Sequence, residues 1–280
     1  MSPLNRTESR EFVEALARGI EVIRCFDATH MEMSVSEVAA RTGLARPTAR
    51  RLLMTLEQLG YMRSADGVYA LTAKTLELGT AYISALGVWD IARPHMQALV
   101  DRTRESTSMS QLDGSDVVYV ARVAVPKIIA LSVSIGTRFP ATATSMGRVL
   151  LAGLTTDELD AVLAVPSASG ILPRVQLDRP ALDAALAGVR AQGWALSDEQ
   201  LSVGIRSVAV PVTGADGRTA AAMNVTTHAA ETTVEQLLDE HLPLLLDTAQ
   251  AISAEWSHLA RLPVVRMAST GSTGVGRDQP

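Results

Sequence analysis

The sequence predicts a two-part α+β protein. Residues 12–60 carry apolar residues at helical spacing, residues 62–71 have the pattern of a short hairpin, and residues 107–226 alternate between strand-like and helical segments. The 280 residues suffice for two domains with separate cores. No apolar run approaches the ~20 residues that span a bilayer, and the N-terminus lacks the apolar core of a signal peptide, so we expect a cytoplasmic protein.

The first part opens with a polar stretch, residues 1–10, which we expect to be a disordered arm. A helix is predicted over residues 12–27, and the single cysteine, Cys25, is expected to be a small core residue in it. The apolar stripe expected to pack beneath the following helices consists of Val13, Leu16, Ile20 and Ile23.

Two short amphipathic helices are predicted between residues 35 and 60. Ser34 and Glu37 have the spacing of a capping box at the start of the first helix. Gly43 allows the positive φ of a tight turn between the helices, and Leu44 is expected to fill the angle between them. This is a helix-turn-helix pattern, and the residues expected to face inward are Val38, Ala39, Leu52, Leu53, Leu56 and Leu59.

The start of the second helix has a chemistry that suits DNA. Pro47 lies in the first turn, where its missing N–H costs nothing. Arginine binds guanine bidentately or contacts a phosphate, and we expect Arg50 to read a base and Arg51 to contact a phosphate. An isolated pair of arginines is more often a solvated helix face, so the neighbouring segment decides between these readings.

That neighbouring segment predicts a wing. Residues 62–71 form a hairpin pattern with Asp66 and Gly67 at its turn, and between residues 41 and 63 five arginines are opposed only by Glu57. A winged helix-turn-helix is therefore predicted. Its expected DNA-binding residues are Arg46, Pro47, Thr48, Arg50, Arg51 and Arg63.

The net charge of −5 is unevenly distributed along the chain. Residues 1–88 hold ten of the 25 basic and ten of the 30 acidic residues, so the remainder of the chain holds fifteen and twenty. A neutral first part with one basic face, joined to an acidic second part, fits local contact with DNA and reduced non-specific binding.

A helix over residues 72–86 is followed by a hinge at Gly87 and Val88, and Trp89 is expected to open the second part. A helix is predicted there up to about residue 104. The further predictions are strands over 107–112, 117–123, 128–135, 194–197, 207–212 and 220–226, with a hairpin turn at Asp216 and Gly217, and helices over 146–152, 156–164, 179–192 and 233–259. The glycine- and serine-rich tail from residue 263 is expected to be disordered.

The segment Thr144-Ser145-Met146-Gly147 is a candidate anion site. It precedes a predicted helix, whose free backbone N–H groups and positive dipole end favour a carboxylate near Ser145, Met146 and Gly147. In the simpler interpretation, Thr144 or Ser145 only caps the helix.

Three segments, in this order, make the chain resemble the IclR family of bacterial transcription regulators. They are Ala17-Arg-Gly-Ile-Glu-Val-Ile, Ala143-Thr-Ser-Met-Gly-Arg-Val-Leu-Leu-Ala152 and Gly204-Ile-Arg-Ser-Val-Ala-Val-Pro-Val212. The resemblance covers roughly residues 11 to 260. It implies a winged helix-turn-helix domain over 11–71, a linker helix over 72–88 and a GAF-like effector domain over 89–262, ahead of the tail over 263–280 that its composition predicts to be disordered.

The same resemblance implies an effector site. Family pockets use the backbone at positions matching Ser145 and Met146, and side chains at positions matching Ser207, Asn224 and Thr226. Relatives often have cysteine at position 207. Glu199 is a further candidate, and Arg138 and Arg148 are weaker ones that are expected to be surface charges.

Two segments, Gly136-Thr-Arg-Phe-Pro-Ala and Thr142-Ala-Thr-Ser-Met-Gly-Arg, resemble the family branch that controls aromatic-acid breakdown through the β-ketoadipate pathway. The expected effector is a small organic acid, either aromatic, such as protocatechuate or 4-hydroxybenzoate, or a dicarboxylate such as β-ketoadipate. The expected partners are double-stranded operator DNA and further copies of the chain, in a homodimer or homotetramer.

Two other classes of protein remain as alternatives. One is an enzyme that acts on a small organic acid, but the sequence has no Gly-x-Ser-x-Gly elbow, P-loop or Rossmann glycine pattern. The other is a purely structural DNA binder with an empty sensory domain. The five histidines lack zinc-site spacing, so we expect no metal, and no cofactor is implied.

Overall fold

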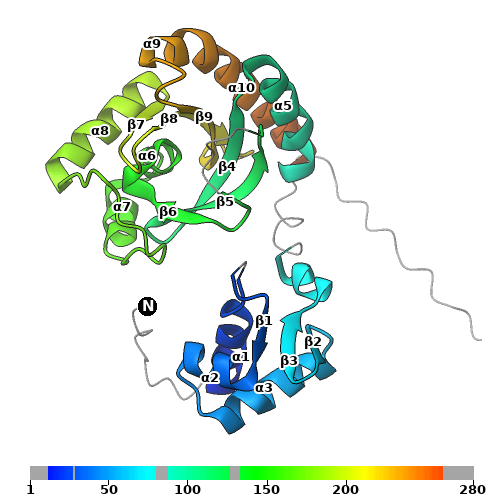
Figure 1. The fold of residues 1–280 in the computed structure, drawn as a ribbon. Helices are drawn as coiled ribbons and strands as arrows, with labels where there is room; N and C mark the ends of the chain where they lie inside the picture. The colour runs from blue at the N-terminus through cyan, green and yellow to red at the C-terminus, as the bar shows by residue number, and fades with distance from the viewer. Residues whose placement is uncertain (1–11, 28, 80–87, 127–132, 261–280) are drawn as a thin grey trace, which may run out of the picture. The chain divides into compact units, whose positions relative to one another are not determined.

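The computed structural model describes residues 12–27, 29–79, 88–126 and 133–260 (Figure 1). The chain divides into two compact units, residues 1–87 and 88–280, which are considered separately below. Within the described ranges, no helix has both the length and the apolar character needed to cross a membrane.

The first unit contains the predicted helix-turn-helix and wing. Strand β1 was not predicted and adds a third strand to the wing, giving an antiparallel sheet in the order β1-β3-β2. The elements are α1 (Glu14–Arg24), β1 (Glu32–Ser34), α2 (Val35–Thr42), α3 (Arg46–Gln58), β2 (Met62–Ala65) and β3 (Val68–Leu71).

Local chemistry sets the boundaries of these elements as the sequence predicted. Ser34 and Glu37 form a reciprocal capping box at the start of α2. Gly43 has φ +68°, and Leu44 packs against the core of the unit. In the hairpin turn, Asp66 and Gly67 have φ values of +51° and +81°, as a type I′ turn requires.

Of the predicted inner face of the first helix, only Ile23 packs against the core, and the other three residues do not. Val13 and Leu16 are 62% and 63% exposed, and Ile20 is also exposed, whereas Val22 and Phe26 are buried. At about 100° per residue, Val22 lies on the opposite side of the helix from Val13. Both sides of α1 carry apolar residues, so periodicity could not choose between them. Leu59, predicted to face inward, lies just after α3 and is also exposed.

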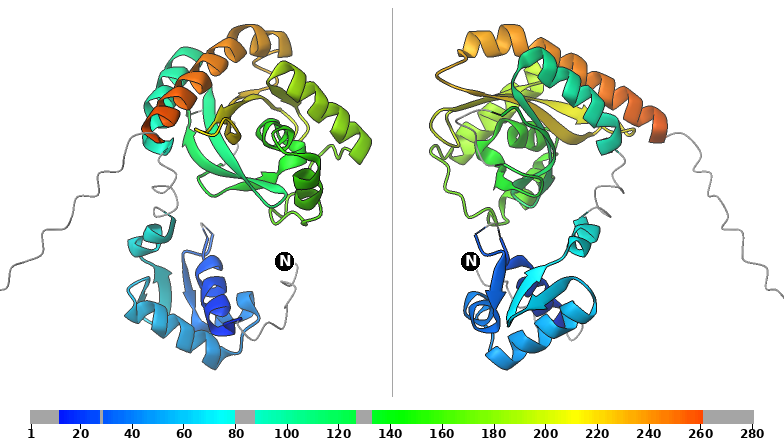
Figure 2. Two further views of the ribbon diagram at one scale, coloured as in Figure 1. Left: turned by 180° about the vertical axis from the view of Figure 1, so that it is seen from behind. Right: turned by 45° about the vertical axis from the view of Figure 1, so that its right-hand side comes forward.

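The second unit is built on a six-stranded antiparallel sheet in the order β6-β5-β4-β9-β8-β7. Helices α6, α7 and α8 lie on one side of this sheet, and α5 and α10 on the other (Figure 2). The strands are β4 (Ser106–Asp113), β5 (Asp116–Val123), β6 (Arg138–Pro140), β7 (Ala195–Asp198), β8 (Ile205–Thr213) and β9 (Thr219–His228). The helices are α5 (Val88–Thr103), α6 (Ser145–Ala152), α7 (Thr156–Leu163), α8 (Arg179–Gln192) and α10 (Leu242–Ala260).

Most of the predicted elements of this unit are confirmed, with two differences. The strand predicted over 128–135 falls mainly on residues outside the described ranges, and residues 133–135 are not a strand; β6 follows instead. The final helical run is interrupted, since α9 (Val234–Gln236) and α10 are separated by a π-helical segment, η3 (Leu237–His241).

Several predictions fall wholly or partly outside the described residues. These are the arm over 1–10, the tail from 263 and most of the helix over 72–86. Of that helix, the described part comprises the short 3₁₀ helix η1 (Ala73–Thr75) and a helical turn over 76–79.

The start of α6 packs closely on the turn before it. A Cβ built on Gly147 would lie 2.0 Å from the carbonyl oxygen of Ala141 and 2.4 Å from its Cα. Because both are backbone atoms, no side-chain rotation relieves the overlap. Any larger residue at position 147 must therefore displace α6.

We expect Gly147→Ala to lower the free energy of unfolding by about 1–3 kcal/mol or more, through this overlap. Gly188→Ala is the matched control, since it lies inside α8 with no atom within 4 Å of its added Cβ. That control should raise stability by about 0.5–1 kcal/mol. Urea unfolding measures both changes, and equal effects would contradict the packing argument.

Candidate functional site

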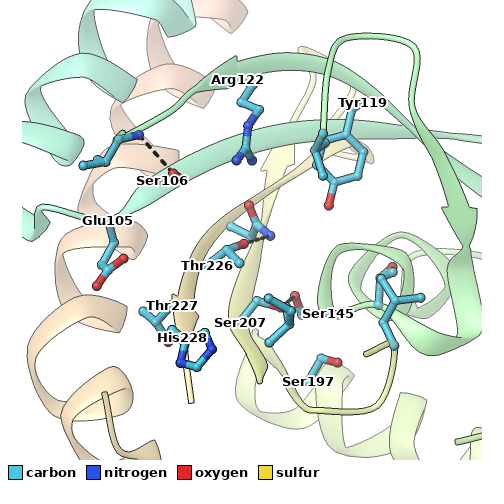
Figure 3. A pocket seen from close by; sticks show the side chains of 16 residues that line it. Glu105, Ser106, Tyr119, Arg122, Ser145, Ser197, Ser207, Thr226, Thr227 and His228 are labelled. Atoms are coloured by element: carbon cyan, nitrogen blue, oxygen red, sulfur yellow. Dashed lines mark hydrogen bonds between the residues drawn. The ribbon is translucent and has the colours of Figure 1, made fainter. Parts of the chain in front are cut away.

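A pocket lies on the side of the sheet that faces α6 (Figure 3). Most of its lining residues are of polar types, and they come from segments far apart in the sequence. The lining residues are Glu105, Ser106, Tyr119, Arg122, Val125, Val133, Thr144, Ser145, Ser197, Leu201, Ile205, Ser207, Asn224, Thr226, Thr227 and His228. We call this space the sheet pocket.

Strand register explains why so many polar side chains meet there. One row of directly paired residues crosses β4, β9, β8 and β7, and a second row crosses β5, β4 and β9. Paired residues in an antiparallel sheet share a face, so all of these side chains lie on the pocket side. The first row is Ser106, Thr226, Ser207 and Ser197, and the second is Arg122, Ser108 and Asn224.

The start of α6 borders the sheet pocket, and Thr144 is its cap. The Thr144 hydroxyl accepts the Gly147 N–H at 3.0 Å. The Ser145 side chain is not a cap, because its hydroxyl lies 2.7 Å from that of Ser207. Among the residues that the structure describes, no group accepts a hydrogen bond from the backbone N–H of Ser145 or Met146. Both residues are buried, so two free donors remain at the helix start.

Three predicted effector residues do not line the sheet pocket. The Met146 side chain packs in the core and accepts the Ser110 hydroxyl at 3.3 Å, and the N–H of Gly147 is occupied by Thr144. The Glu199 carboxylate accepts the Gly204 N–H at 2.8 Å and so holds the loop between β7 and β8. Of the seven predicted effector residues, the structure brings four together in the lining, Ser145, Ser207, Asn224 and Thr226.

The expectation that Arg148 is a surface charge is wrong. Its side chain is buried and donates to the carbonyls of Thr142 and Leu196 and to the Gln200 side chain. Burial lowers the pKa of Arg148 from its ordinary value. Arg138 lies away from the pocket lining and pairs with Asp113 at 2.5 Å and Asp116 at 3.5 Å. Both arginines therefore join segments of the domain.

Two pocket residues, Arg122 and Tyr119, were missed by the sequence analysis. Arg122 is half-buried and donates to the Ser108 hydroxyl at 3.0 Å. The Tyr119 ring packs edge-on against Phe139 with centroids 5.6 Å apart. Both side chains extend from β5 into the same space (Figure 3).

An irregularity in β5 brings these two side chains together. Residues three apart on a regular strand point to opposite faces. Here the register with β4 shifts between Met109 and Ser110, so that Arg122 pairs with Ser108 while Tyr119 pairs with Ser110. This β-bulge returns both side chains to the pocket face. The alternating serines of β4 indicate in the sequence that one face of this strand is polar. The bulge in β5 leaves no recognisable pattern in the sequence, so the positions of Arg122 and Tyr119 could not be predicted.

The candidate DNA interface is the outer face of α3. Arg46, Arg50 and Arg51 are exposed, and no residue in the described ranges forms an ion pair with them. Thr48 is half-buried, and Arg63 in the wing pairs with Glu32 at 3.0 Å. Three of the predicted basic residues thus remain available to DNA in the unbound protein.

Helix geometry ranks the arginines of α3. Ala49, Leu53 and Leu56 form its buried side. At about 100° per residue, Arg51 lies opposite that side, in line with Pro47, whereas Arg50 lies on the flank. A helix that enters the major groove presents its outermost side chains to the bases. This placement favours Arg51 as the base reader and Arg50 as the phosphate contact, the reverse of the sequence-based expectation.

Asn224 joins β9 to β4 in addition to lining the sheet pocket. Its Oδ1 accepts the Ser108 N–H at 3.1 Å, and its Nδ2 donates to the Thr226 hydroxyl at 2.9 Å. Both Asn224 and Ser108 are buried. Removing the Asn224 side chain would take away two buried hydrogen bonds, one from the Ser108 N–H and one to the Thr226 hydroxyl.

We therefore expect Asn224→Ala to lower the free energy of unfolding by about 1–3 kcal/mol. Thr226→Val is the comparison, because Thr226 is partly exposed and its loss leaves the Ser108 N–H bonded. The effect of that variant should be smaller. Chemical denaturation measures the free energy of unfolding of both variants. An unchanged denaturation midpoint for Asn224→Ala would contradict the role of Asn224 in joining β9 to β4.

Comparison with known proteins places the chain in a family. The model of the bacterial transcriptional regulator IclR C-terminal domain matches residues 80–254, and that of the IclR helix-turn-helix domain matches residues 15–66. The chain is 38% identical over 241 residues to the Pca regulon regulatory protein of Pseudomonas putida, covering 86% of this chain and 83% of that protein.

Two solved structures support the same placement. One, from Rhodococcus sp. RHA1, has 46% identity and a TM-score of 0.79, covering 89% of this chain and all of the other. The second is an IclR homologue from Microbacterium hydrocarbonoxydans complexed with 4-hydroxybenzoate, with 25% identity and a TM-score of 0.76, covering 87% of this chain and 99% of the other. The protein belongs to the IclR family of bacterial transcription regulators.

Proposed function

We propose that this regulator senses a small organic acid of aromatic catabolism in the sheet pocket and controls catabolic genes by binding operator DNA through α3 and its wing. The observation that carries the effector site is the start of α6. There the free N–H groups of Ser145 and Met146 lie beside a pocket lined by serine hydroxyls. A carboxylate suits free donors at a helix N-terminus.

Two relatives support the proposed chemical class of the effector. The Pseudomonas putida relative is named for the Pca regulon, and the Microbacterium homologue was solved with 4-hydroxybenzoate. Because the family consists of transcription regulators, these names favour a regulator that senses the acid over an enzyme that converts it.

The effector site also has a physical connection to the start of the second unit. Strand β9, which carries Asn224 and Thr226, leads through a short turn into α9 and α10. Helix α10 packs along α5, where Glu255 accepts from His95 at 2.9 Å. Helix α5 begins directly after the segment that joins the units. A shift of β9 would therefore be transmitted through α10 and α5 to that segment. We expect a coupling free energy of about 1–3 kcal/mol.

The regulator is proposed to act as a homodimer or homotetramer. Support comes from the outer stripe of α1, where Val13, Leu16 and Ile20 expose apolar side chains in the single chain. Contact with a second copy would remove this surface from water.

The effector proposal is tested by isothermal titration of the purified protein with benzoate, 4-hydroxybenzoate and protocatechuate, repeated with Thr226→Val. The Thr226 hydroxyl accepts from Asn224, which leaves its own proton for a ligand. We expect at least one acid to bind and the variant to bind it about tenfold more weakly. If none of these acids binds, or the variant binds equally well, the assignment is contradicted.

The DNA proposal is tested by operator binding at several salt concentrations. Arg51→Ala should cost about 1–3 kcal/mol on the operator and relax sequence preference, because it removes the outermost arginine of α3. Arg50→Ala should weaken binding to all sequences alike and lower the salt slope by about one. The reverse pattern would restore the sequence-based assignment, and no effect from either variant would exclude this face of α3.

A further inference from the structure

We propose that Thr72, Lys74 and Thr75 are positioning residues through which the acid-bound state of the second unit changes DNA binding by α3. These three residues bond the start of the chain that leads to the second unit onto the C-terminal end of α3, and we call their contacts the α3 clamp. This inference rests on the proposed function, since it takes α3 as the DNA reader and the sheet pocket as the effector site. It adds the residues by which that site would regulate the reader.

The C-terminal end of α3 provides a row of backbone acceptors. Gly60 has φ +81°, and the N–H groups of Gly60 and Tyr61 donate back to the carbonyls of Glu57 and Leu56, each at 2.9 Å. These two bonds form a Schellman motif, which ends the helix. The carbonyls of Leu59, Gly60 and Tyr61 come after these acceptors in the chain, so they need donors from another segment.

Two threonines after β3 supply most of these donors. The Thr72 hydroxyl donates to the Gly60 carbonyl at 2.6 Å. The Tyr61 carbonyl accepts twice, from the Thr72 N–H at 2.9 Å and from the Thr75 hydroxyl at 3.2 Å. Both hydroxyl bonds are half-buried, so water competes with them less than at an open surface.

Lys74 adds a charged contact to the α3 clamp. Its Nζ donates to the Leu59 carbonyl at 3.0 Å and lies 5.2 Å from the centroid of the Tyr61 ring. The ammonium group therefore lies at the negative end of the α3 dipole. At 1.5 Å per residue, Leu59 is about 12 Å beyond Arg51 along the helix axis. Lys74 thus holds α3 at the end away from the arginines proposed to contact DNA.

The chain that joins the units is anchored at its other end as well. Helix α5 begins at Val88, and Val88, Ile91 and Ala92 are buried in the second unit. The helix packs against α10 and β5. Both ends of the chain between residues 75 and 88 are therefore attached to packed elements. A displacement of α5 is passed to α3 through the clamp, because neither attachment leaves a free end to absorb it.

The test variant combines Lys74→Met with Thr75→Val, which removes two side-chain donors and largely keeps the size of both residues. Thr72 is retained because its hydroxyl also accepts the Lys74 N–H at 3.3 Å and caps η1. Thr42→Val is the matched control. It removes a half-buried hydroxyl bond of the same kind, to the Val38 carbonyl at 2.7 Å, from α2 of the same unit.

The affinity of the full-length protein for DNA is measured by fluorescence anisotropy, with and without saturating acid. The DNA is a duplex that the wild type selects from a random-sequence pool. The acid is whichever of benzoate, 4-hydroxybenzoate and protocatechuate binds most tightly in isothermal titration. In the wild type, the acid should change the affinity for the duplex by about fivefold or more.

In the double variant this factor should fall below about twofold, while the affinity for the acid stays within about twofold of the wild type. Thr42→Val should keep the full factor, and so should Lys74→Arg, which retains a charged donor. Thr75→Val alone should lower the factor by a smaller amount, and it provides the test if the double variant does not fold.

An unchanged factor would overturn the role of the α3 clamp even if the double variant bound DNA more weakly, because a purely structural contact affects both affinities alike. A wild-type protein that bound the acid without changing its affinity for the duplex would also overturn this inference, with acid binding and DNA binding left standing. If no duplex were selected or no acid bound, the proposed function would fail, and this inference with it.

Discussion

The second unit depends on how the start of α6 is held against the sheet. Thr144 caps the helix by accepting the Gly147 N–H, and Gly147 has no side chain because the Ala141 backbone occupies that space. Together these contacts fix where Ser145 and Met146 present their free N–H groups. Had the cap been Ser145, its hydroxyl would be turned away from Ser207, and the donors beside the sheet pocket would be arranged differently.

The two faces of the sheet differ in role: one packs against helices, and the other lines the sheet pocket. On β9, Met223 and Val225 point to the side covered by α5 and α10, while Asn224 and Thr226 point to the sheet pocket. Polar side chains on the pocket face are tolerated because they bond to one another, as the Asn224 contacts to Ser108 and Thr226 illustrate. Among the described residues, the Tyr119 hydroxyl and the N–H groups at the start of α6 have no partner, and both are donors suited to a ligand.

The elements with strong local signals could be predicted from the sequence. The capping box at Ser34, the Asp66-Gly67 turn and the helices from α6 to α8 are set by residues close together in the chain. The packed side of α1 and the buried environment of Arg148 depend on contacts with distant segments, which periodicity does not encode. Of the seven residues predicted for an effector site, four line the sheet pocket, whereas Arg122 and Tyr119 come together there only through a bulge in β5.

The central claim is that an acid binds at the start of α6. Its most direct test is a crystal structure of the protein with a bound acid, chosen from those that bind in solution. We predict a carboxylate oxygen within hydrogen-bond distance of the Ser145 and Met146 N–H groups, beside the Ser145 and Ser207 hydroxyls. A ligand seated elsewhere in the domain, with those N–H groups still free, would contradict the account.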